Sequence, residues 1–473
     1  MARILMVSSE ARPFSKTGGL ADVLGSLPPA LVEAGQEVAV VLPRYRTTSL
    51  GGAHKIADDI TLWIGPGRYT ASLWQVHNRG VDYYLVDCPV FFDRDGLYAT
   101  AGKDYWDNDT RFAGLCHGAL HVARHFFRPN IIHCHDWQTG LLPAYLHQYY
   151  ATDPTFHGVK TVFTIHNLGY QGLFDRGRMF WLGLPDSIFR PDLVEFHGRI
   201  NLLKAGLVYS DALTTVSPTY AQEIQTPEQG FGLDGLLRAR SASLSGILNG
   251  IDYSVWNTET DPHLAAHFSH RDLEGKRACK LDLLRTMGLP TDEPDVPVIG
   301  IVSRFASQKG FDLIAQVAYD LIHWDLKMAV LGNGDPQYES LFRTLAEMRP
   351  GKFAVRVAFD DALAHKIEAG SDMFLMPSHY EPCGLNQMYS LRYGAVPVVH
   401  ATGGLDDTID SGTGFKFWSY SGEAMLGALR EALTVYASDR DRWTGMMRAG
   451  MQRDFSWSTS AAAYSELYAS LLA

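Results

Sequence analysis

Cysteine is scarce in this sequence, long apolar runs are missing, and basic residues are outnumbered by acidic ones. The five cysteines among 473 residues are odd in number, scattered, and form no Cys-x-x-Cys pair. This pattern argues against disulfide bonding and predicts reduced thiols in a cytoplasmic protein. No uninterrupted apolar stretch approaches the roughly 18 residues that cross a bilayer, and the apolar run at the N-terminus is too short for a signal peptide. We therefore expect no membrane partner.

The charge balance excludes a further class of protein. Lysine and arginine total 41 against 52 aspartates and glutamates, so the net charge is −11. A protein whose main partner is nucleic acid needs a basic surface, which this balance disfavours, although a local cationic pocket is compatible with it. Hydrophobic residues make up 46% of the chain and charged residues 20%, which is an ordinary globular composition. The length predicts two or three domains with large cores.

Short β-branched runs alternate with helical stretches along most of the chain, and this alternation predicts parallel sheets with right-handed crossovers. Two series of strands are expected, at residues 3–8, 37–42, 83–87, 131–134, 159–165 and 212–216, and then at 297–303, 327–331, 354–359, 373–376 and 396–399. The fold class is therefore α/β, with two Rossmann-like doubly wound sheets.

The boundary between the two halves is expected near residue 250. The stretch 258–297 is polar and proline-punctuated, which is typical of a junction, and residues 456–473 read as a last helix. The sequence T-G-G-L-x-D occurs at residues 17–22 and again at 402–407, which hints at two related halves. Ligands of open α/β sheets bind outside the carboxyl ends of the strands, so two facing sheets would hold a ligand in the cleft between them.

The first motif is Lys16-Thr17-Gly18-Gly19-Leu20, which opens a helix with apolar residues at helical spacing. A glycine pair at a helix start lets a ligand approach the backbone, and the helix N-terminus attracts anions. A plain glycine turn is an equally good interpretation of the pattern alone. Pro28-Pro29 should kink or break this helix, and Gly35 should end it.

The second motif runs from Ser303 to Gly310 and contains Arg304 and Lys309. Lys309 precedes a helix expected near Phe311, where a cation opposes the helix dipole at a cost of about 0.3–1 kcal/mol. Two cations at this position are explained best by an anion between them, such as a nucleotide diphosphate. The alternative is a pair of solvated surface cations.

The third motif, Ser378 to Leu385, follows a predicted strand and contains Glu381, Pro382 and Cys383. Pro382 fits the first position of a helix that would run to Gly394. Glu381 then lies beside a helix start, where it would act as a cap or accept hydrogen bonds from ligand hydroxyls. Cys383 has no basic partner in the motif, so we expect a packed thiol and not a nucleophile.

Polar residues also end two strands of the first series. His133 and His135 are two residues apart in His133-Cys134-His135-Asp136-Trp137, but no third ligand follows at a metal-binding spacing, so a metal site is not predicted. The pair His166-Asn167 ends the next strand, and Asn249-Gly250 reads as a turn.

Taken in order, these motifs resemble one family. KTGGLADV, HDW, TIHNL, NGID, SRxxxQKG, LGNGDPxYE, EPCGLNQ and ATGGLDDT lie between residues 16 and 408. The chain is similar to bacterial glycogen synthases and plant starch synthases, glycosyltransferase family five, over nearly its whole length.

The resemblance implies the glycosyltransferase-B fold, with two Rossmann-like domains facing across a cleft. It implies an acceptor-side domain at residues 1–250, a nucleotide-sugar domain at 251–455, and a helix at 456–473 that crosses back to the first domain. The implied reaction moves glucose from ADP-glucose to the non-reducing end of glycogen or another α-1,4-glucan, with retention of configuration and without a metal or cofactor. The leaving phosphate oxygen would take the proton of the acceptor hydroxyl.

Residue roles follow from the same resemblance. Arg304 and Lys309 would grip the diphosphate, and Glu381 would contact the glucosyl ring. His166 would lie beside the transferring sugar and Asp136 close to the acceptor. The remaining donor-binding residues would be Lys16, Gly18, Gly19, Asn249, Cys383, Gly384, Leu385, Thr402, Gly403 and Gly404.

Two positions depart from the wider pattern. His400 stands where many relatives carry arginine, which leaves the phosphate environment and the nucleotide preference open. Tyr389 replaces a glutamate of broader retaining relatives, as in the glycogen synthase group. Alternative hypotheses are a transferase that uses UDP-glucose or a short acceptor, a nucleotide-sugar epimerase on the same fold, and an inactive glycan-binding protein. The oligomeric state is left open.

Overall fold

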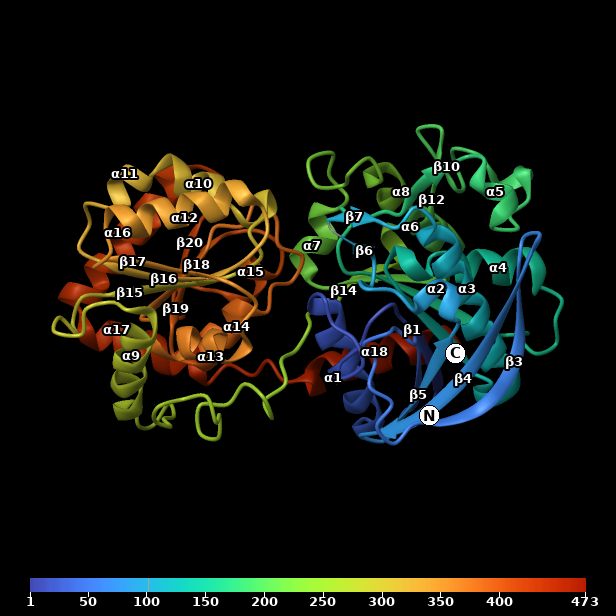
Figure 1. Cartoon of the computed structure of the whole chain (residues 1–473), viewed down its shortest axis with the longest axis horizontal. Helices are drawn as coiled ribbons and strands as arrows, with labels where there is room; N and C mark the ends of the chain where they lie inside the picture. The colour runs from blue at the N-terminus through green and yellow to red at the C-terminus, as the bar shows by residue number, and fades with distance from the viewer. Residues whose placement is uncertain (101) are drawn as a thin grey trace. The chain divides into compact units, whose positions relative to one another are not determined.

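A computed structural model describes residues 1–100 and 102–473 of the chain (Figure 1). The chain divides into two compact units. The first comprises Met1–Val216, Ala221–Gly250 and Trp457–Ala473, and the second comprises Ser217–Tyr220 and Ile251–Ser456.

The first unit is built on a nine-stranded sheet. Its strand order is β14-β13-β9-β8-β1-β2-β5-β4-β3. The strands are β1 Arg3–Val7, β2 Glu37–Pro43, β3 His54–Ile64, β4 Gly67–Asn78, β5 Val81–Asp87, β8 Ile131–His135, β9 Lys160–Ile165, β13 Ala212–Thr215 and β14 Leu244–Gly246. The six strands predicted for this half are confirmed to within two residues at each end.

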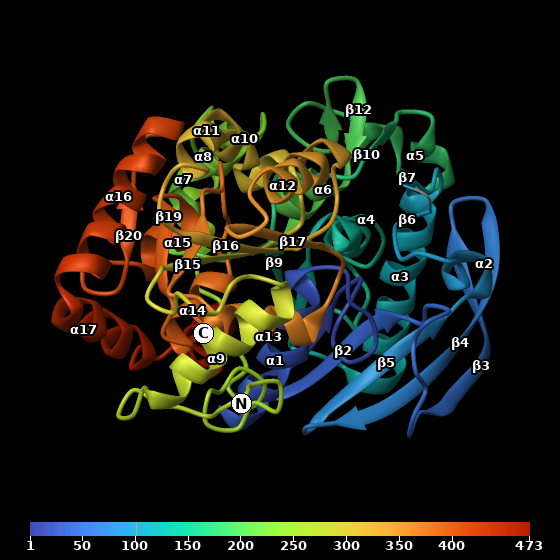
Figure 2. The same cartoon turned by 60° about the vertical axis from the view of Figure 1, so that its left-hand side comes forward.

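The sheet differs from the prediction at one edge, because it is mixed and not wholly parallel. Strands β14 to β5 pair in parallel, but β4 is antiparallel to both β5 and β3. Figure 2 shows β3 and β4 as a long hairpin at this edge. Residues in the second half of β3 alternate between buried and exposed, as expected for a strand with one wet face. Small outer sheets join β10 Leu173–Asp175 to β12 Arg199–Asn201 and β11 Glu195–Phe196, and β6 Ala99–Thr100 to β7 Lys103–Asp104.

Helices cover the first sheet. They are α1 Gly19–Glu33, α2 Pro89–Phe92, α3 Asn108–Val122, α4 Leu141–Tyr149, α5 Arg178–Trp181, α6 Leu202–Tyr209, α8 Asp234–Ala239 and α18 Trp457–Leu472, while α7 Pro218–Glu223 crosses the division between the units. Helix α18 packs against α1, and Tyr464 and Tyr468 are buried in the same apolar cluster as Leu24 and Leu27. The last segment of the chain thus completes the core of the first unit.

Helix α1 is not broken at its proline pair. It continues to Glu33 with Pro28 and Pro29 inside it, and Gly35 follows with a φ of 86°. The prolines remove two backbone hydrogen bonds, but nine residues of the helix are buried against the sheet and α18. Burial of this apolar face holds the helix together where local propensity disfavours it.

The second unit is a six-stranded parallel sheet between two helical layers. Its order is β17-β16-β15-β18-β19-β20, with β15 Val298–Val302, β16 Lys327–Gly332, β17 Phe353–Val357, β18 Met373–Met376, β19 Val396–His400 and β20 Phe415–Phe417. Figure 1 shows α10 Phe311–Gln316, α11 Ala318–Leu321, α12 Pro336–Met348 and α16 Gly422–Ser438 on one face, and α9 Glu274–Met287, α13 Asp361–Gly370, α14 Asn386–Arg392 and α17 Arg440–Met451 on the other. All five predicted strands are confirmed, and β20 was not predicted.

The polar stretch 258–297 is part of the second unit and contains α9. Just before it, Trp256 stacks between His365 and Tyr389, with ring centroids 3.8 and 3.7 Å away. The buried Asp261 carboxylate accepts a hydrogen bond from the Tyr393 hydroxyl at 2.6 Å. This segment is anchored by aromatic stacking and a buried carboxylate, which its polar composition conceals.

None of the helices in the described parts of the chain is both long and apolar enough to cross a membrane. The five cysteine side chains are buried, free thiols.

Candidate active site residues

The predicted site residues lie at the carboxyl edges of the two sheets, each in its own unit. In the first unit Lys16 follows β1, Asp136 follows β8, His166 follows β9 and Asn249 lies beyond β14. In the second unit Arg304 and Lys309 follow β15, Glu381 follows β18, and Gly403 and Gly404 follow β19. Parallel pairing puts the carboxyl ends of neighbouring strands at the same edge of the sheet, so each unit gathers one group of these residues.

The turn before α1 is held by Glu10, a residue that the sequence analysis did not single out. The Glu10 carboxylate accepts hydrogen bonds from the Thr17 backbone N–H, from the Thr17 hydroxyl at 2.9 Å and from the Tyr98 hydroxyl at 2.9 Å. Burial raises the pKa of Glu10, and these hydrogen bonds oppose the rise. A buried carboxylate with three donors fixes the backbone that leads into Gly18.

Gly18 is the N-cap of α1, and no side chain of a described residue caps this helix end. The backbone N–H groups of the first turn are therefore available to an anion. Beside them, the Lys16 ammonium contacts the Asp22 carboxylate at 2.8 Å, and Arg12 contacts the same carboxylate at 2.9 Å. The structure thus places Lys16 at the start of α1 within a small charged cluster.

Asp136 and His166 form a joined pair. The Asp136 carboxylate accepts a hydrogen bond from the His166 backbone N–H at 2.7 Å, and burial raises the pKa of Asp136 to about 7. Burial lowers the pKa of His166 to about 3, so its imidazole is neutral at physiological pH. Asp136 also has a φ of 57°, which is a strained value for a residue other than glycine and is frequent at functional sites.

His135, at the end of β8, contacts the His166 ring and orients it. Its Nδ1 lies 3.0 Å from His166 Nε2, and the His135 side chain is fully buried. Its Nε2 has no hydrogen-bond partner among residues 1–100 and 102–473. Because each imidazole is neutral, one of the two facing nitrogens donates and the other accepts.

Asn249 is buried in the first unit, and its Oδ1 lacks a hydrogen-bond partner in the described part of the chain. Most buried polar side-chain atoms are satisfied in native proteins, so an exception is a pointer to a ligand or to a bound water. The structure gives Asn249 an unsatisfied acceptor at the edge where a ligand is expected.

His133 has a structural role and not a ligating one. Its Nδ1 lies 2.7 Å from the Tyr468 hydroxyl of α18, and its Nε2 lies 2.6 Å from the Thr164 hydroxyl. Over the described ranges, no group of three or more His, Cys, Asp or Glu side chains is arranged to hold a metal ion.

Lys309 and Glu381 form a close ion pair in the second unit. Lys309 Nζ lies 2.6 Å from Glu381 Oε2, and the Ser378 hydroxyl donates to the same oxygen at 2.9 Å. The Glu381 side chain is buried, and that of Lys309 is 19% exposed. Glu381 therefore orients the ammonium of Lys309, and Ser378 orients Glu381.

Arg304 differs from Lys309 in being exposed and without a side-chain partner in the regions that the structure describes. It lies two residues beyond β15 and five before Lys309. An arginine that the fold does not use is free to bind an external anion through its fork of N–H groups.

The loop that carries Glu381 packs directly on the second T-G-G turn. The Gly404 backbone N–H donates to the Glu381 carbonyl at 3.1 Å. A Cβ at Gly403, whose φ is 46°, would collide with the carbonyl oxygen of Glu381, and a Cβ at Gly404 with that of Cys383. Thr402 is the N-cap of the short helix α15 Gly403–Thr408. The structure thus brings Glu381, Cys383, Thr402, Gly403 and Gly404 together.

The prediction that Pro382 begins a helix is wrong. Helix α14 begins at Asn386 with Leu385 as its N-cap, and Gly384 before it has a φ of 69°. The Gln387 side-chain amide donates to the carbonyls of Cys383 and Gly384, both at 3.0 Å. These hydrogen bonds hold residues 382–385 as a turn, which delays the helix by one turn.

His400 is buried below this loop. Its Nδ1 lies 2.8 Å from the Ser378 carbonyl oxygen and its Nε2 lies 3.3 Å from that of Trp418. Burial lowers its pKa. His400 supports the loop that carries Ser378 and Glu381. Tyr389, the other departure, stacks on Trp256.

Sequence reasoning missed Glu10, His135 and Ser378 as supporting residues. Each lies within ten residues of a predicted site residue, and Glu10 and His135 are charged or titratable residues at or just after the end of an apolar strand. That position is a usable signal, since the carboxyl end of a parallel strand is where α/β ligands bind.

Comparison with known families gives two matches that together span most of the chain. Residues 3–239 match the family described as starch synthase catalytic domain. Residues 290–445 match the family described as glycosyl transferases group 1.

Relatives match over the full length. The glycogen synthase of Koribacter versatilis is 53% identical over 98% of this chain and 97% of its own length. That of Myxococcus xanthus is 48% identical over 99% of both chains.

Among solved structures, the catalytic domain of starch synthase IV from Arabidopsis thaliana, bound to ADP and acarbose, matches with a TM-score of 0.91. It is 32% identical, and the match covers 100% of this chain and 99% of that domain. Sucrose-phosphate synthase from Thermosynechococcus elongatus shares the fold, with a TM-score of 0.61 at 17% identity.

Proposed function

The chain belongs to the family of glycogen and starch synthases, and from this premise we propose that it transfers glucose from ADP-glucose to the non-reducing end of an α-1,4-glucan, with retention of configuration. Its relatives are glycogen synthases along their whole length, and the starch synthase of similar fold was solved with ADP. The observation that carries the proposal is the cation group of the second unit, where Lys309 is oriented by Glu381 and the Arg304 side chain has no partner among residues 1–100 and 102–473.

In the proposed reaction, the bond between glucose C1 and the β-phosphate oxygen of ADP-glucose breaks as the acceptor's 4-hydroxyl bonds to C1 from the same face. The acceptor proton passes to the departing phosphate oxygen, and ADP leaves. Negative charge builds on the diphosphate and positive charge on the sugar. Arg304 and Lys309 would stabilise the first through charge-assisted hydrogen bonds, each worth about 1.5–3 kcal/mol.

The first unit supports the sugar side of the proposal. His166 is neutral, because burial lowers its pKa to about 3, and a neutral imidazole suits a sugar hydroxyl better than a phosphate. Asn249 offers an unsatisfied carbonyl oxygen to another hydroxyl. The N–H groups at the start of α1 and the ammonium of Lys16 would face the donor's phosphates, and Asp136 would lie at the acceptor. The five thiols without disulfides fit a cytoplasmic enzyme.

The experiment is an incorporation assay with ADP-[14C]glucose and UDP-[14C]glucose, each with and without glycogen. We expect label in precipitated polysaccharide only when glycogen is present, with the faster rate from ADP-glucose, and we expect β-amylase to release the label as maltose. The Lys309→Ala variant serves as the negative control. Donor consumption without labelled glucan would contradict transfer and favour a reaction on the nucleotide sugar alone, while faster incorporation from UDP-glucose would overturn the donor assignment.

A further inference from the structure

The first unit contains a cavity that shares no residue with the candidate active site. Its volume is about 570 Å³. The walls are the turn between β3 and β4, the end of α4 and the segment that follows α5, and His117 of α3 contributes to the lining. Six aromatic rings line it, from Trp63, His117, Tyr145, Tyr149, Tyr150 and Phe180.

The walls come from distant parts of the sequence, and direct contacts fix them to one another. The Tyr145 hydroxyl donates to the Leu182 carbonyl at 2.7 Å, and the Tyr149 hydroxyl donates to that of Gly183. A Cβ at Gly65 of the β3–β4 turn would collide with the Phe180 carbonyl oxygen. The cavity is therefore a formed feature of the fold and not a gap between mobile loops.

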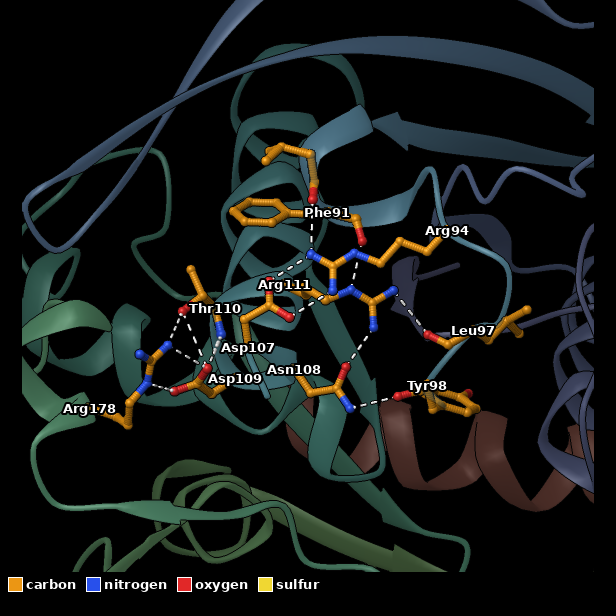
Figure 3. Close-up of polar contacts among 11 residues, drawn as sticks. Phe91, Arg94, Leu97, Tyr98, Asp107, Asn108, Asp109, Thr110, Arg111 and Arg178 are labelled. Carbon is orange, nitrogen blue, oxygen red and sulfur yellow. Dashed lines mark hydrogen bonds and ion pairs between the residues drawn. The ribbon is translucent and has the colours of Figure 1, made fainter. Parts of the chain in front are cut away.

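An ion pair anchors α5 to α3. Arg178 contacts the fully buried carboxylate of Asp109 in α3 through two N–H groups, at 2.6 and 2.8 Å, and donates to the Thr110 hydroxyl at 2.7 Å (Figure 3). A bidentate guanidinium–carboxylate pair fixes orientation as well as distance. This pair holds the segment that presents Phe180 and Trp181.

The rim of the cavity exposes large apolar side chains together. Trp63 is 62% exposed, Phe180 65% and Tyr149 53%. Single exposed apolar residues are common and need no explanation, but several aromatic rings around one cavity mark a binding surface. Their exposure in a preformed cavity indicates a ligand with apolar faces.

The chemistry of the lining selects an uncharged ligand. Asp, Glu, Lys and Arg are absent from it among the residues that the structure describes. Burial lowers the pKa of His117 to about 4, so this ring is neutral as well. A nucleotide, a phosphate or a charged peptide would lose hydration here without gaining a counter-charge.

We propose that this cavity binds glucose units of an α-1,4-glucan and so forms a second contact with the polymer acceptor. The apolar faces of pyranose rings pack on aromatic rings. The exposed Tyr149 hydroxyl, whose own proton goes to the Gly183 carbonyl, keeps an acceptor site for a sugar hydroxyl. This inference rests on the proposed function, which supplies the neutral polymer. A second contact on the same polymer raises the local concentration of chain ends without changing the chemical step.

The test is the double variant Trp63→Ala/Phe180→Ala, with glycogen and maltotetraose as probes. We expect the fraction of protein that co-sediments with glycogen to fall by about tenfold and the KM for glycogen to rise by about fivefold, because one of two linked contacts is lost. The kcat and the rate with maltotetraose, which is too short to reach a second site, should not change. Tyr319→Ala, which removes a 75% exposed ring of α11, is the matched control.

Unchanged co-sedimentation by a folded double variant would overturn the proposal. An equal loss of rate with glycogen and maltotetraose would also overturn it, since that result indicates damage to the active site. If the double variant does not fold by circular dichroism, Phe180→Ala alone replaces it. Co-sedimentation needs no sugar donor, so loss of glycogen binding would support the cavity even if neither labelled donor were used, and a failed transfer assay would then count against the proposed function alone.

Discussion

The sequence T-G-G-L-x-D occurs once in each unit, and its two copies have different surroundings. Gly18 has an extended backbone, with φ −152°, and a Cβ there would meet no described heavy atom within 4 Å. Gly403 has a φ of 46°, and a Cβ there would collide with the Glu381 carbonyl oxygen. The first glycine leaves space beside a helix N-terminus, whereas the second lets two loops of the fold touch. The second copy thus serves packing, and for the first copy we propose that the open space serves ligand access.

The charge states of the two groups differ in the same way. The first unit places buried titratable groups at its sheet edge, with the pKa of Asp136 raised to about 7 and that of His166 lowered to about 3 by burial. The second unit places an ion pair and an exposed arginine there. A neutral imidazole suits a sugar hydroxyl and cations suit a diphosphate. We therefore propose that the second unit, with Lys16 of the first, holds the diphosphate, while His166 meets the sugar.

The largest expected effect separates the two glycines by stability. Gly403→Ala should lower the free energy of unfolding by about 3 kcal/mol or more, because it adds a backbone clash to an unfavourable φ. Gly18→Ala should change it by less than about 1 kcal/mol, since its φ suits any residue and the space is open. Urea unfolding followed by circular dichroism measures both.

The same pair of variants also separates access from packing. Gly18→Ala should lower glucose incorporation by about tenfold while remaining stable, as expected when a Cβ enters the path of a bound ligand. Equal stability of the two variants would show that the two copies do not differ as described.

The next effect concerns the pH dependence contributed by Asp136. Its folded pKa of about 7 lies above its ordinary value of 3.8, so between these values the unfolded chain binds fewer protons at this group and stability falls as pH rises. Asp136→Asn keeps an acceptor for the His166 N–H but removes the titration. The unfolding free energy of the variant minus that of the wild type should rise by about 2 kcal/mol from pH 5 to pH 7.5.

The matched control in the second unit is Gln337→Ala in α12, an exposed change that removes no titratable group, so its difference from the wild type should not vary with pH. If the unfolding free energy of Asp136→Asn minus that of the wild type stays constant over this pH range, the Asp136 carboxyl has an ordinary pKa. The two units would then not differ in the charge states described above.

The smallest expected effect is that of Glu10→Gln. The Glu10 carboxylate accepts three hydrogen bonds. In the variant, the NH₂ group of the amide would face at least one of these donors, and the lost hydrogen bond costs about 1–2 kcal/mol of stability. The displaced turn should lower incorporation by about tenfold. Glu33→Gln, an exposed change at the other end of α1, is the control. Full activity of Glu10→Gln would show that the turn needs no support from this carboxylate.

The sequence predicted the central strands well because their apolar, β-branched runs are buried on both faces. It did not predict β3 and β4. One face of these strands is exposed to solvent, so apolar residues do not form a continuous run in their sequences. Helix α14 was placed one turn too early because the side chain of Gln387 holds the turn before it. Propensity and spacing describe local choices, and these elements depend on contacts made after folding.

The residues of the candidate site also fall into two groups, those that local sequence indicates and those that depend on contacts made after folding. Asp136, His166 and Glu381 could be proposed from the sequence because each follows a strong predicted strand, and strand ends are readable from sequence. Their supports could not be, since the hydrogen bonds of Glu10 to Thr17 and of Ser378 to Glu381 depend on how loops close. The unsatisfied oxygen of Asn249 likewise has no signal in a turn sequence.

The most direct test of the central claim, that cations of the second unit hold the departing diphosphate, is the rate of glucose incorporation from ADP-glucose by Arg304→Ala. Arg304 is exposed and has no partner in the described parts of the fold, so its truncation should leave stability unchanged. The control is Arg343→Ala, which truncates an exposed arginine of α12. We predict that Arg304→Ala incorporates glucose at least about 100-fold more slowly than this control, as for a lost transition-state donor. A rate within about twofold of the control would contradict the claim.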